Sequence, residues 1–484
     1  MSGENRNGTV AGATGPAGVD LRALARQGPV HFVGISGAGM SALAELVLRS
    51  GGSVTGCDLR PGAAGEALSA MGARITMGHD PAHARDAAAV VTTAAVPADL
   101  PELVAARERG IPVLKRAQAL GALVNRGYVV AIAGTHGKTT TTAMTAAILA
   151  EAGLDPTAFV GGRVPEWGSG FRRGSDRIFV VEADEYDRSF HTLRPDVAVV
   201  TTVEADHLDV YGTLDAVEAA FRTFVEPVPA DGLVAACVDD PGARRLLESA
   251  TSGQRLGYGT GPEATLRAVD IELRGGECRF KVVDGGETLG FLTVGVPGEH
   301  SIRNALGAFA AARHAGASFE HAQRALAAFR GVGRRFETVA EVGTITIVDD
   351  YAHHPTEVAV TLRAARTAFP GRRIVAVFQP HLYSRTRDFA TEFGEALAAA
   401  DVVWVTDVYP AREEPIPGVS GELIHAAVQA SGRARAHYHA ATDDLAERLA
   451  DALEPGDVCI TIGAGPIDEV GRELAGVLGR RSRP

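Results

Sequence analysis

The chain has 484 residues, of which 46% are hydrophobic, and its formal net charge at pH 7 is -12. This length exceeds what a single hydrophobic core supports and predicts about three domains of roughly 100–200 residues each. The acidic balance, without a basic block, argues against a nucleic-acid partner. The four cysteines lie far apart without a CxxC pair, which indicates neither a zinc motif nor a disulfide framework and favours a reducing, cytoplasmic location.

Residues 1–27 are rich in Gly, Ala, Asn and Thr and lack a continuous apolar core, so we expect a flexible tail rather than a signal peptide. No later run approaches the roughly 18 apolar residues of a membrane span, so no membrane insertion is expected. The sequence leaves the oligomeric state unknown.

From residue 30, short β-branched runs alternate with Ala- and Leu-rich helical stretches, which is typical of parallel α/β sheets. A first series covers strands at 30–34, 53–58 and 87–96, with helices at 41–51 and 102–109. A second series starts at residue 128 and has strands at 177–184 and 196–207, followed at 233–295 by a Gly-rich segment that predicts an antiparallel appendage. A third series has strands within 344–354, 372–381, 401–409 and 457–465.

A phosphate-binding loop is indicated by the stretch VVAIAGTHGKTTTT at residues 129–142, where a strand pattern leads through a glycine turn into a helical pattern. The N–H groups at such a helix start hold phosphates. The spacing is shorter than in a strict P-loop, because Ile132 stands where the first glycine is usual. Lys138 should reach the β- and γ-phosphates and the Thr139 hydroxyl should meet Mg²⁺, the alternative being a plain turn with a solvated lysine. The candidate phosphate-binding residues are Gly134, Thr135, His136, Gly137, Lys138, Thr139 and Thr140.

A second glycine turn, GISGAGM at residues 34–40, follows a predicted strand and opens a predicted helix, and Asp58 ends the next strand. Its glycines are spaced G-x-x-G-x-G rather than G-x-G-x-x-G, so the motif favours a diphosphate at a helix N-terminus over a nicotinamide cofactor. A tight turn without a ligand is the alternative. The candidate residues are Gly34, Ser36, Gly37, Ala38, Gly39, Met40 and Asp58.

Two E-A-D triplets, at residues 182–184 and 204–206, each follow an apolar strand in the same segment as Lys138. Strand ends of a parallel sheet meet at one edge, so Glu182 and His207 are expected to approach Lys138 there. A carboxylate and an imidazole near a triphosphate suggest ligands for Mg²⁺ or Mn²⁺, although a satisfied or solvated role is the alternative.

Eight ordered motifs together resemble those of the Mur ligase family. They run from about Val30 to about Pro466 and read GISGAGMS, AGTHGKTTTT, VEADEYDRSF, VEADHLDVY, GVGRRF, DDYAHHPTE, FQPHLYSRTR and YPAREEPIPG. The resemblance implies an α/β protein of three domains: a Rossmann-like N-terminal domain for a UDP-sugar, a P-loop ATPase-like central domain with the antiparallel appendage, and a Rossmann-like C-terminal domain for an amino acid. We expect these domains at 28–125, 126–336 and 337–484.

The same resemblance implies an ATP-dependent ligase that joins L-alanine to the lactyl carboxylate of UDP-N-acetylmuramate through an acyl phosphate, in peptidoglycan precursor synthesis. Its cofactors would be ATP and Mg²⁺, and the glycine turn at 34–40 would hold the uridine diphosphate. His300 and Asn304 match positions that flank adenine, Arg335 a phosphate contact and Asp350 the ribose. Tyr351, His353 and Arg385 match the amino-acid end of the site, with Arg385 pairing with the alanine carboxylate and His353 a candidate base.

The chain departs from the family pattern at three positions. Leu382 stands where an arginine is often found, Thr202 replaces an expected Asn, and Pro466 follows the glycines at 463 and 465 where a small polar residue is usual. In addition, no lysine lies between Asp209 and Asp231, the region where several sister ligases carry a carbamylated lysine.

Three other functions fit parts of the sequence. A recycling ligase that joins an intact peptide to the same UDP-sugar would share most of these motifs. A nicotinamide-dependent dehydrogenase would use the glycine turn at 34–40 and Asp58 but would leave Lys138, Glu182 and His207 without a role. A catalytically inactive nucleotide sensor is disfavoured by the intact set of phosphate and metal residues.

Overall fold

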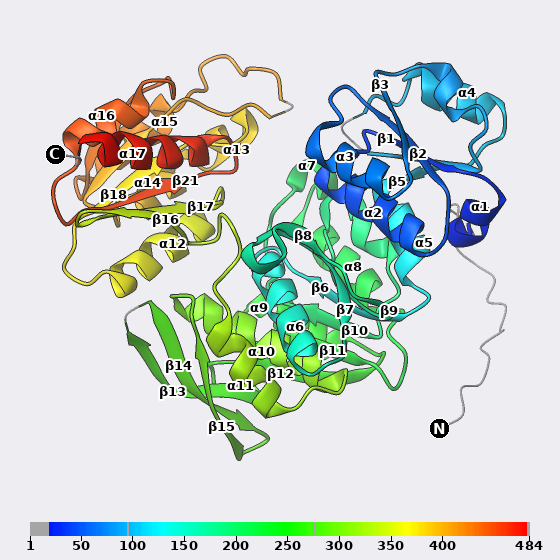
Figure 1. Ribbon diagram of the computed structural model, residues 1–484. Helices are drawn as coiled ribbons and strands as arrows, with labels where there is room; N and C mark the ends of the chain where they lie inside the picture. The colour runs from blue at the N-terminus through cyan, green and yellow to red at the C-terminus, as the bar shows by residue number, and fades with distance from the viewer. Residues whose placement is uncertain (1–18, 94–95, 275, 412, 482–484) are drawn as a thin grey trace. The chain divides into compact units, whose positions relative to one another are not determined.

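The computed structural model describes residues 19–93, 96–274, 276–411 and 413–481, without the side chains of residues 208 and 209 (Figure 1). The chain forms two compact units, one of residues 1–126 with 192–194 and one of residues 127–191 with 195–484. Among the described residues, the first unit contains one sheet and the second contains two. Within the described part of the chain, no helix is both long and apolar enough to span a bilayer.

The first unit is built on a parallel sheet of order β3-β2-β1-β4-β5. Its strands are β1 (Val30–Val33), β2 (Val54–Asp58), β3 (Arg74–Met77), β4 (Ala89–Thr92) and β5 (Val113–Lys115). Its helices are α1 (Leu21–Gln27), α2 (Ala38–Arg49), α3 (Gly62–Ala70), η1 (Pro81–Ala84), α4 (Pro101–Glu108) and α5 (Arg116–Val124). The βαβ alternation of this segment is therefore confirmed. Residues 94–95 of the strand expected at 87–96 lie outside the described residues.

The expectation of a flexible tail through residue 27 is wrong for its last part. Residues 21–27 form α1, whose N-cap Asp20 accepts a hydrogen bond from the N–H of Ala23 at 3.0 Å. Leu21 and Ala25 are buried. A helix of two turns is marginal by itself, so burial of its apolar side is what stabilises it, and composition could not reveal that packing. Residues 1–18 of the expected tail lie outside the described residues.

A ten-stranded sheet forms the middle of the second unit, in the order β15-β14-β13-β12-β11-β10-β6-β9-β7-β8. Helices α6 and α10 pack against one another and bury the main core of the unit. The strands are β6 (Tyr128–Ala133), β7 (Pro156–Val164), β8 (Ser169–Arg172), β9 (Ser175–Glu182), β10 (Val197–Val200), β11 (Leu233–Cys237), β12 (Gln254–Gly259), β13 (Leu266–Arg274), β14 (Glu277–Asp284) and β15 (Glu287–Val294). The helices are α6 (Lys138–Glu151), η2 (Pro165–Trp167), η3 (Tyr186–Thr192), α7 (Leu208–Tyr211), α8 (Leu214–Val225), α9 (Pro241–Ser249), α10 (Glu299–His314) and α11 (Phe319–Ala328).

The antiparallel appendage is smaller than the expected range 233–295. Strands β11 and β12 pair parallel with their neighbours, and only β13, β14 and β15 form the antiparallel extension visible in green in Figure 1. The reason is that α9 connects β11 to β12, and a helical crossover returns the chain in the same direction, whereas the tight turn at 285–286 reverses it between β14 and β15.

The last sheet is parallel except for one edge and has the order β16-β17-β21-β18-β19-β20. Helices pack on both of its faces, where two hydrophobic clusters lie. Its strands are β16 (Glu337–Val342), β17 (Ile345–Asp350), β18 (Ile374–Phe378), β19 (Val402–Val405), β20 (Arg435–Tyr438) and β21 (Val458–Ile462). Its helices are α12 (Pro355–Ala368), α13 (Tyr383–Asp388), α14 (Ala390–Leu397), α15 (Glu422–Ser431), α16 (Leu445–Ala452) and α17 (Ile467–Arg481).

Candidate active site

The loop between β6 and α6 has the shape that the glycine pattern predicts. Gly134 and Gly137 both have positive φ angles, of 137° and 83°, and Gly137 caps α6. A Cβ atom at Gly137 would lie 2.6 Å from Oδ1 of Asn304, so this position requires glycine for space as well as for its backbone angle. The start of α6 therefore has the glycine-capped form in which the N–H groups of a helix N-terminus bind an anion.

Thr202 holds this loop in place from the neighbouring strand end. Its hydroxyl accepts a hydrogen bond from the N–H of His136 at 2.9 Å, and its carbonyl accepts one from the N–H of Thr135 at 2.9 Å. Thr202 replaces the Asn expected from the family pattern, but it still supplies a side-chain oxygen that accepts the N–H of His136.

Lys138 is half-buried at the start of α6. Its Nζ donates to the carbonyl of Gly134 at 2.6 Å and to the carboxylate of Glu185 at 2.9 Å. Burial by itself lowers the pKa of Lys138, but the carboxylates of Glu185 and Asp184 outweigh it, and the pKa lies above its ordinary value. Lys138 is therefore a fixed cation beside the loop at neutral pH.

Glu182, at the end of β9, lies against the loop as predicted. The Thr139 hydroxyl donates to Oε1 of Glu182 at 2.9 Å, and Oε2 accepts the N–H of Gly161. His207 has a left-handed backbone with φ of 53°, and its Nε2 lies 3.8 Å from Oε1 of Glu185. Lys138, Thr139, Glu182 and His207 all line one hollow of about 610 Å³, so the structure brings the predicted phosphate and metal residues together.

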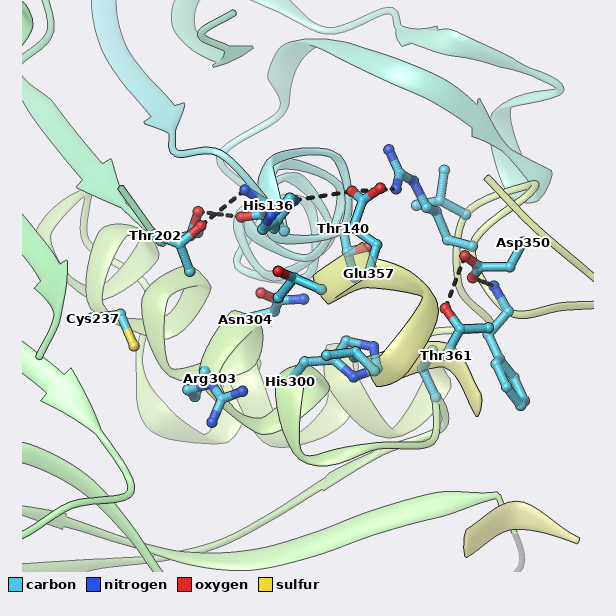
Figure 2. A pocket seen from close by; sticks show the side chains of 18 of the residues that line it. His136, Thr140, Thr202, Cys237, His300, Arg303, Asn304, Asp350, Glu357 and Thr361 are labelled. Atoms are coloured by element: carbon cyan, nitrogen blue, oxygen red, sulfur yellow. Dashed lines mark hydrogen bonds and ion pairs between the residues drawn. The ribbon is translucent and has the colours of Figure 1, made fainter. Parts of the chain in front are cut away.

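A second hollow lies on the other side of the loop, and Figure 2 shows its lining. His300 and Asn304 enter it from α10, while Asp350 enters from the end of β17. Burial, with the nearby guanidinium groups of Arg303 and Arg335, lowers the pKa of His300 to about 4, so its imidazole is neutral. A neutral ring and an amide suit recognition of an uncharged heterocycle.

Asp350 is held by three donors. It accepts the N–H of Phe336 at 2.8 Å, the N–H of Ala352 at 2.9 Å and the hydroxyl of Thr361 at 3.1 Å. Burial raises the pKa of this carboxyl to about 6, although Arg335 and the N–H donors oppose the shift. The carboxyl is thus oriented toward the hollow at a fixed position.

His136 lies between two carboxylates, one on α12 and one in the loop after β10. Its Nδ1 is 3.1 Å from Oε1 of Glu357 on α12 (Figure 2), and its Nε2 is 3.6 Å from Oε2 of Glu204. Burial opposes the charged form, but Glu357 and then Glu204 raise the pKa of His136 to about 10. The loop therefore carries a second cation, two positions before Lys138 in the sequence and bound to α12.

The far end of the first hollow is lined by groups from the last sheet. Arg385 is buried and donates from Nη2 to Oδ1 of Asp206 at 2.8 Å. Nδ1 of His353 lies 2.9 Å from the carbonyl of Tyr351, which accepts its proton and leaves Nε2 as the free acceptor. Burial lowers the pKa of His353, so the ring can act as a base near neutral pH.

In comparisons with known proteins, models of one protein family match three successive segments of this chain. Residues 29–128 match the model of the Mur ligase family, catalytic domain; residues 132–312 match the Mur ligase middle domain; and residues 334–465 match the Mur ligase, glutamate ligase domain. The chain belongs to the Mur ligase family. It is thus a member of a family of ATP-dependent, amide-forming ligases with a three-domain α/β fold.

Individual members of the Mur ligase family are similar to this chain over more than 90% of its length. A UDP-N-acetylmuramate--L-alanine ligase of Acidothermus cellulolyticus is 48% identical over 444 residues, which cover 91% of this chain and 93% of that protein. A crystal structure of the UDP-N-acetylmuramate-alanine ligase of Thermotoga maritima has a TM-score of 0.78 at 29% identity, covering 94% of this chain and 100% of the other. A murein peptide ligase of Psychrobacter arcticus has a TM-score of 0.67 at 26% identity, covering 93% and 99%.

The Mur ligase motif at residues 34–40 lies in the first unit, where it forms the turn from β1 into α2. Gly37 caps α2, and Oδ2 of Asp58 accepts the N–H of Ser36 at 3.0 Å. Asp58 therefore also serves to hold the turn, a structural role that the sequence analysis did not assign. The binding of a diphosphate at this turn stays a prediction.

The two arginines of the GVGRRF motif have different surroundings. Arg334 donates to Asp349 at 3.1 Å and to the carbonyls of Gly463 and Gly465 at 2.7 and 3.0 Å, so it links the ends of β17 and β21. Arg335 lines both hollows. The motif itself does not indicate this difference, because it shows two adjacent arginines but not the direction in which each side chain points.

Several charged site residues were missed by sequence reasoning. Glu185 pairs with Lys138, Asp206 pairs with Arg385, and Glu204 and Glu357 flank His136. Glu185 and Asp206 lie within the same motifs as Glu182 and His207, so the sequence did indicate that they are near the site. Their partners are distant in sequence, and the pairing itself could not be read from either motif.

Proposed function

We propose that this chain joins L-alanine to the lactyl carboxylate of UDP-N-acetylmuramate, at the expense of ATP, in peptidoglycan precursor synthesis. The observation that carries the proposal is that one phosphate-binding loop borders two hollows. Residues 136, 137 and 140 line the hollow with His300, Asn304 and Asp350, while Lys138 and Thr139 line the hollow with His353 and Arg385. A nucleotide with its base in the first hollow would present its terminal phosphate to the second.

The donor set around Thr139 fits a divalent cation. A hydroxyl and a carboxylate oxygen 2.9 Å apart suit Mg²⁺, and the imidazole of His207 suits Mn²⁺ as well. Thr139, Glu182 and His207 are therefore the proposed ligands. When bound there, the cation would offset negative charge on the phosphate oxygens.

A carboxylate must be activated before an amine can form an amide with it, because its oxygen is a poor leaving group. Transfer of the γ-phosphoryl group of ATP to the lactyl carboxylate gives an acyl phosphate, and the cation of Lys138 stabilises the charge on the moving group. The amine of L-alanine then attacks the acyl carbon, and the tetrahedral adduct expels inorganic phosphate to leave the amide.

Three residues are assigned to the amino-acid end. Arg385, already placed by Asp206, pairs with the alanine carboxylate, and Tyr351 lines the same hollow. His353 takes a proton from the alanine ammonium on its free Nε2. His300 and Asn304 are proposed to flank adenine, Arg335 to contact phosphate and Asp350 to bind the ribose.

The uridine diphosphate is proposed to bind at residues 34–40 of the first unit, where the turn opens α2. We also propose that the chain divides functionally at about residues 125 and 336, and that the enzyme acts in the cytoplasm. All four cysteines are free and buried, which is in keeping with a reducing compartment.

One assay tests this function against its rivals. Phosphate release from ATP is measured with UDP-N-acetylmuramate, with and without L-alanine, and with a peptide that begins with L-alanine. Alanine-dependent release, with the alanyl product found by mass spectrometry, supports the proposal. Release only with the peptide would make the chain a recycling ligase, and no release with either acceptor would point to a nucleotide sensor.

A further inference from the structure

Five side chains meet in the first unit, away from both hollows of the active site. His31 comes from β1, Cys57 from β2, His79 from the segment after β3, His83 from η1 and Glu102 from α4. We call this group the imidazole–thiol cluster. Glu102 is at its centre: its oxygens lie 3.0 Å from Nδ1 of His79, 2.9 Å from Nδ1 of His83 and 3.3 Å from Sγ of Cys57.

The cluster is closed to solvent on one side and open on the other. Glu102 is 0% exposed and His31 is 1% exposed, whereas the side chains of His79 and His83 are about one-fifth exposed. The cluster lies beside the hydrophobic group that packs η1 and α4 on this face of the sheet. An ion could therefore enter from the side of the two partly exposed histidines.

One buried atom of the cluster has no hydrogen-bond partner. Nδ1 of His31 is 3.0 Å from the hydroxyl of Thr55, but its Nε2 is unpaired and lies 3.8 Å from Oε1 of Glu102, which is too long for a hydrogen bond. If Thr55 accepts the Nδ1 proton, Nε2 directs its lone pair at a carboxylate. Such an outer hydrogen bond that fixes the tautomer is typical of metal-binding histidines.

The ligand atoms lie close enough together for one small transition-metal ion to bind them after small shifts of their side chains. One ligand atom each from His31, Cys57 and Glu102 lies within 4.8 Å of the other two, and Sγ of Cys57 is 3.3 Å from Nδ1 of His79. A tetrahedral ion with bonds of ~2.0–2.3 Å separates its ligands by ~3.3–3.7 Å. Thiolate and imidazole favour Zn²⁺ or Co²⁺ over Mg²⁺.

We propose that the imidazole–thiol cluster binds one transition-metal ion of the Zn²⁺ type through His31, Cys57, Glu102 and His79. His83 holds the Glu102 carboxylate in place from outside. Binding forms a metal–sulfur bond, and the thiol proton of Cys57 leaves to solvent. The doubly charged ion, one thiolate and one carboxylate together are neutral, so the buried carboxylate gains a fixed counter-charge.

The wide spacing of the cysteines in the sequence gave no sign of this site, because its four ligands come from four separate parts of the chain and only one is a cysteine. Four protein ligands leave no open position, so the ion would be structural. It would tie β1, β2 and α4 to the segment before η1 and would stabilise the first unit.

The test is a titration of the metal-stripped full-length protein with Co²⁺ in excess Mg²⁺. Excess Mg²⁺ occupies the oxygen-rich site of the second unit, and thiolate coordination gives a near-ultraviolet charge-transfer band that oxygen and nitrogen ligands cannot produce. We expect the band to saturate at one equivalent, to disappear in Cys57→Ser and to persist in the buried control Cys459→Ser. We also expect Zn²⁺ to displace Co²⁺ and to raise the melting temperature by several degrees.

A wild-type protein without the band, or a band that persists in Cys57→Ser, would overturn the proposal. Loss of the band in Cys237→Ser would do the same, since Cys237 lines the second hollow. If Cys57→Ser does not fold, Glu102→Gln serves instead: the site predicts at least tenfold weaker Co²⁺ binding, and unchanged affinity would count against it.

Discussion

Nδ1 of His136 lies 3.1 Å from Oε1 of Glu357, so the phosphate-binding loop is bound directly to the first turn of α12. The two residues are 221 positions apart in the chain. Because His136 is also close to Glu204, its charged form is stabilised by both carboxylates, and this contact contributes to the stability of the second unit.

The His136 contact predicts a pH dependence of stability. The folded pKa of about 10 exceeds the ordinary 6.5, so the contribution is fully present below about pH 6.5 and is lost as the pH rises through about 10. His136→Gln should lower the urea midpoint most near pH 6 and progressively less toward pH 10. Unfolding of both proteins across that range, with His425→Gln as a control, measures the difference; a constant difference would contradict the assignment.

Lys138→Ala should lower turnover by about 10²–10³-fold, the range seen when one preorganised donor to a developing charge is removed. Binding of the UDP-sugar should survive, because its diphosphate is assigned to the first unit. Steady-state kinetics and calorimetry test the two parts separately. Lys281→Ala, in the antiparallel extension, is the matched control, and a loss of sugar affinity in Lys138→Ala would argue against separate sites.

His207→Ala should depress activity and recover part of it at high Mg²⁺ or Mn²⁺, since a weakened metal site is filled by mass action. The check is the activity at increasing metal concentration for wild type and variant. A defect of the same size at every concentration would exclude a ligand role for His207.

The Gly137→Ala substitution should be unfavourable for two reasons, the backbone angle and the steric contact of the new side chain. The left-handed angle costs about 1–2 kcal/mol for an alanine, and the new Cβ would also meet Asn304 at 2.6 Å. Gly153→Ala is the matched control, because Gly153 has a φ of 73° but no atom within 4 Å of its Cβ position. We expect nucleotide binding to be lost only in Gly137→Ala, and equal behaviour of the two variants would show that the space beside Asn304 is unimportant.

Activity should be indifferent to bicarbonate. The chain has three lysines, Lys115, Lys138 and Lys281, and only Lys138 lies at the proposed metal site, where it is already paired with Glu185. No other lysine is available there for carbamylation. A ligase assay in degassed buffer, with and without bicarbonate at fixed pH and Mg²⁺, tests this, and reversible activation of several-fold would refute it.

The sequence by itself determined the features that depend on local pattern. A β-branched run, a glycine turn and an Ala-rich stretch specified β6, the loop and α6, because strand, turn and helix preferences act over a few residues. Acidic residues after β9 and β10 could be placed near that loop since parallel strands end at a common edge. Family motifs then extended this frame to the last sheet.

Only the tertiary structure decided which charges meet. Asp206 and Arg385 pair across 179 positions, and Glu102 lies against three histidines and a cysteine from four other parts of the chain. It also decided that α1 is a helix and that β11 and β12 are parallel. Such contacts depend on how separate elements pack, and a carboxylate in an exposed motif has the same local sequence as one that is buried against a partner.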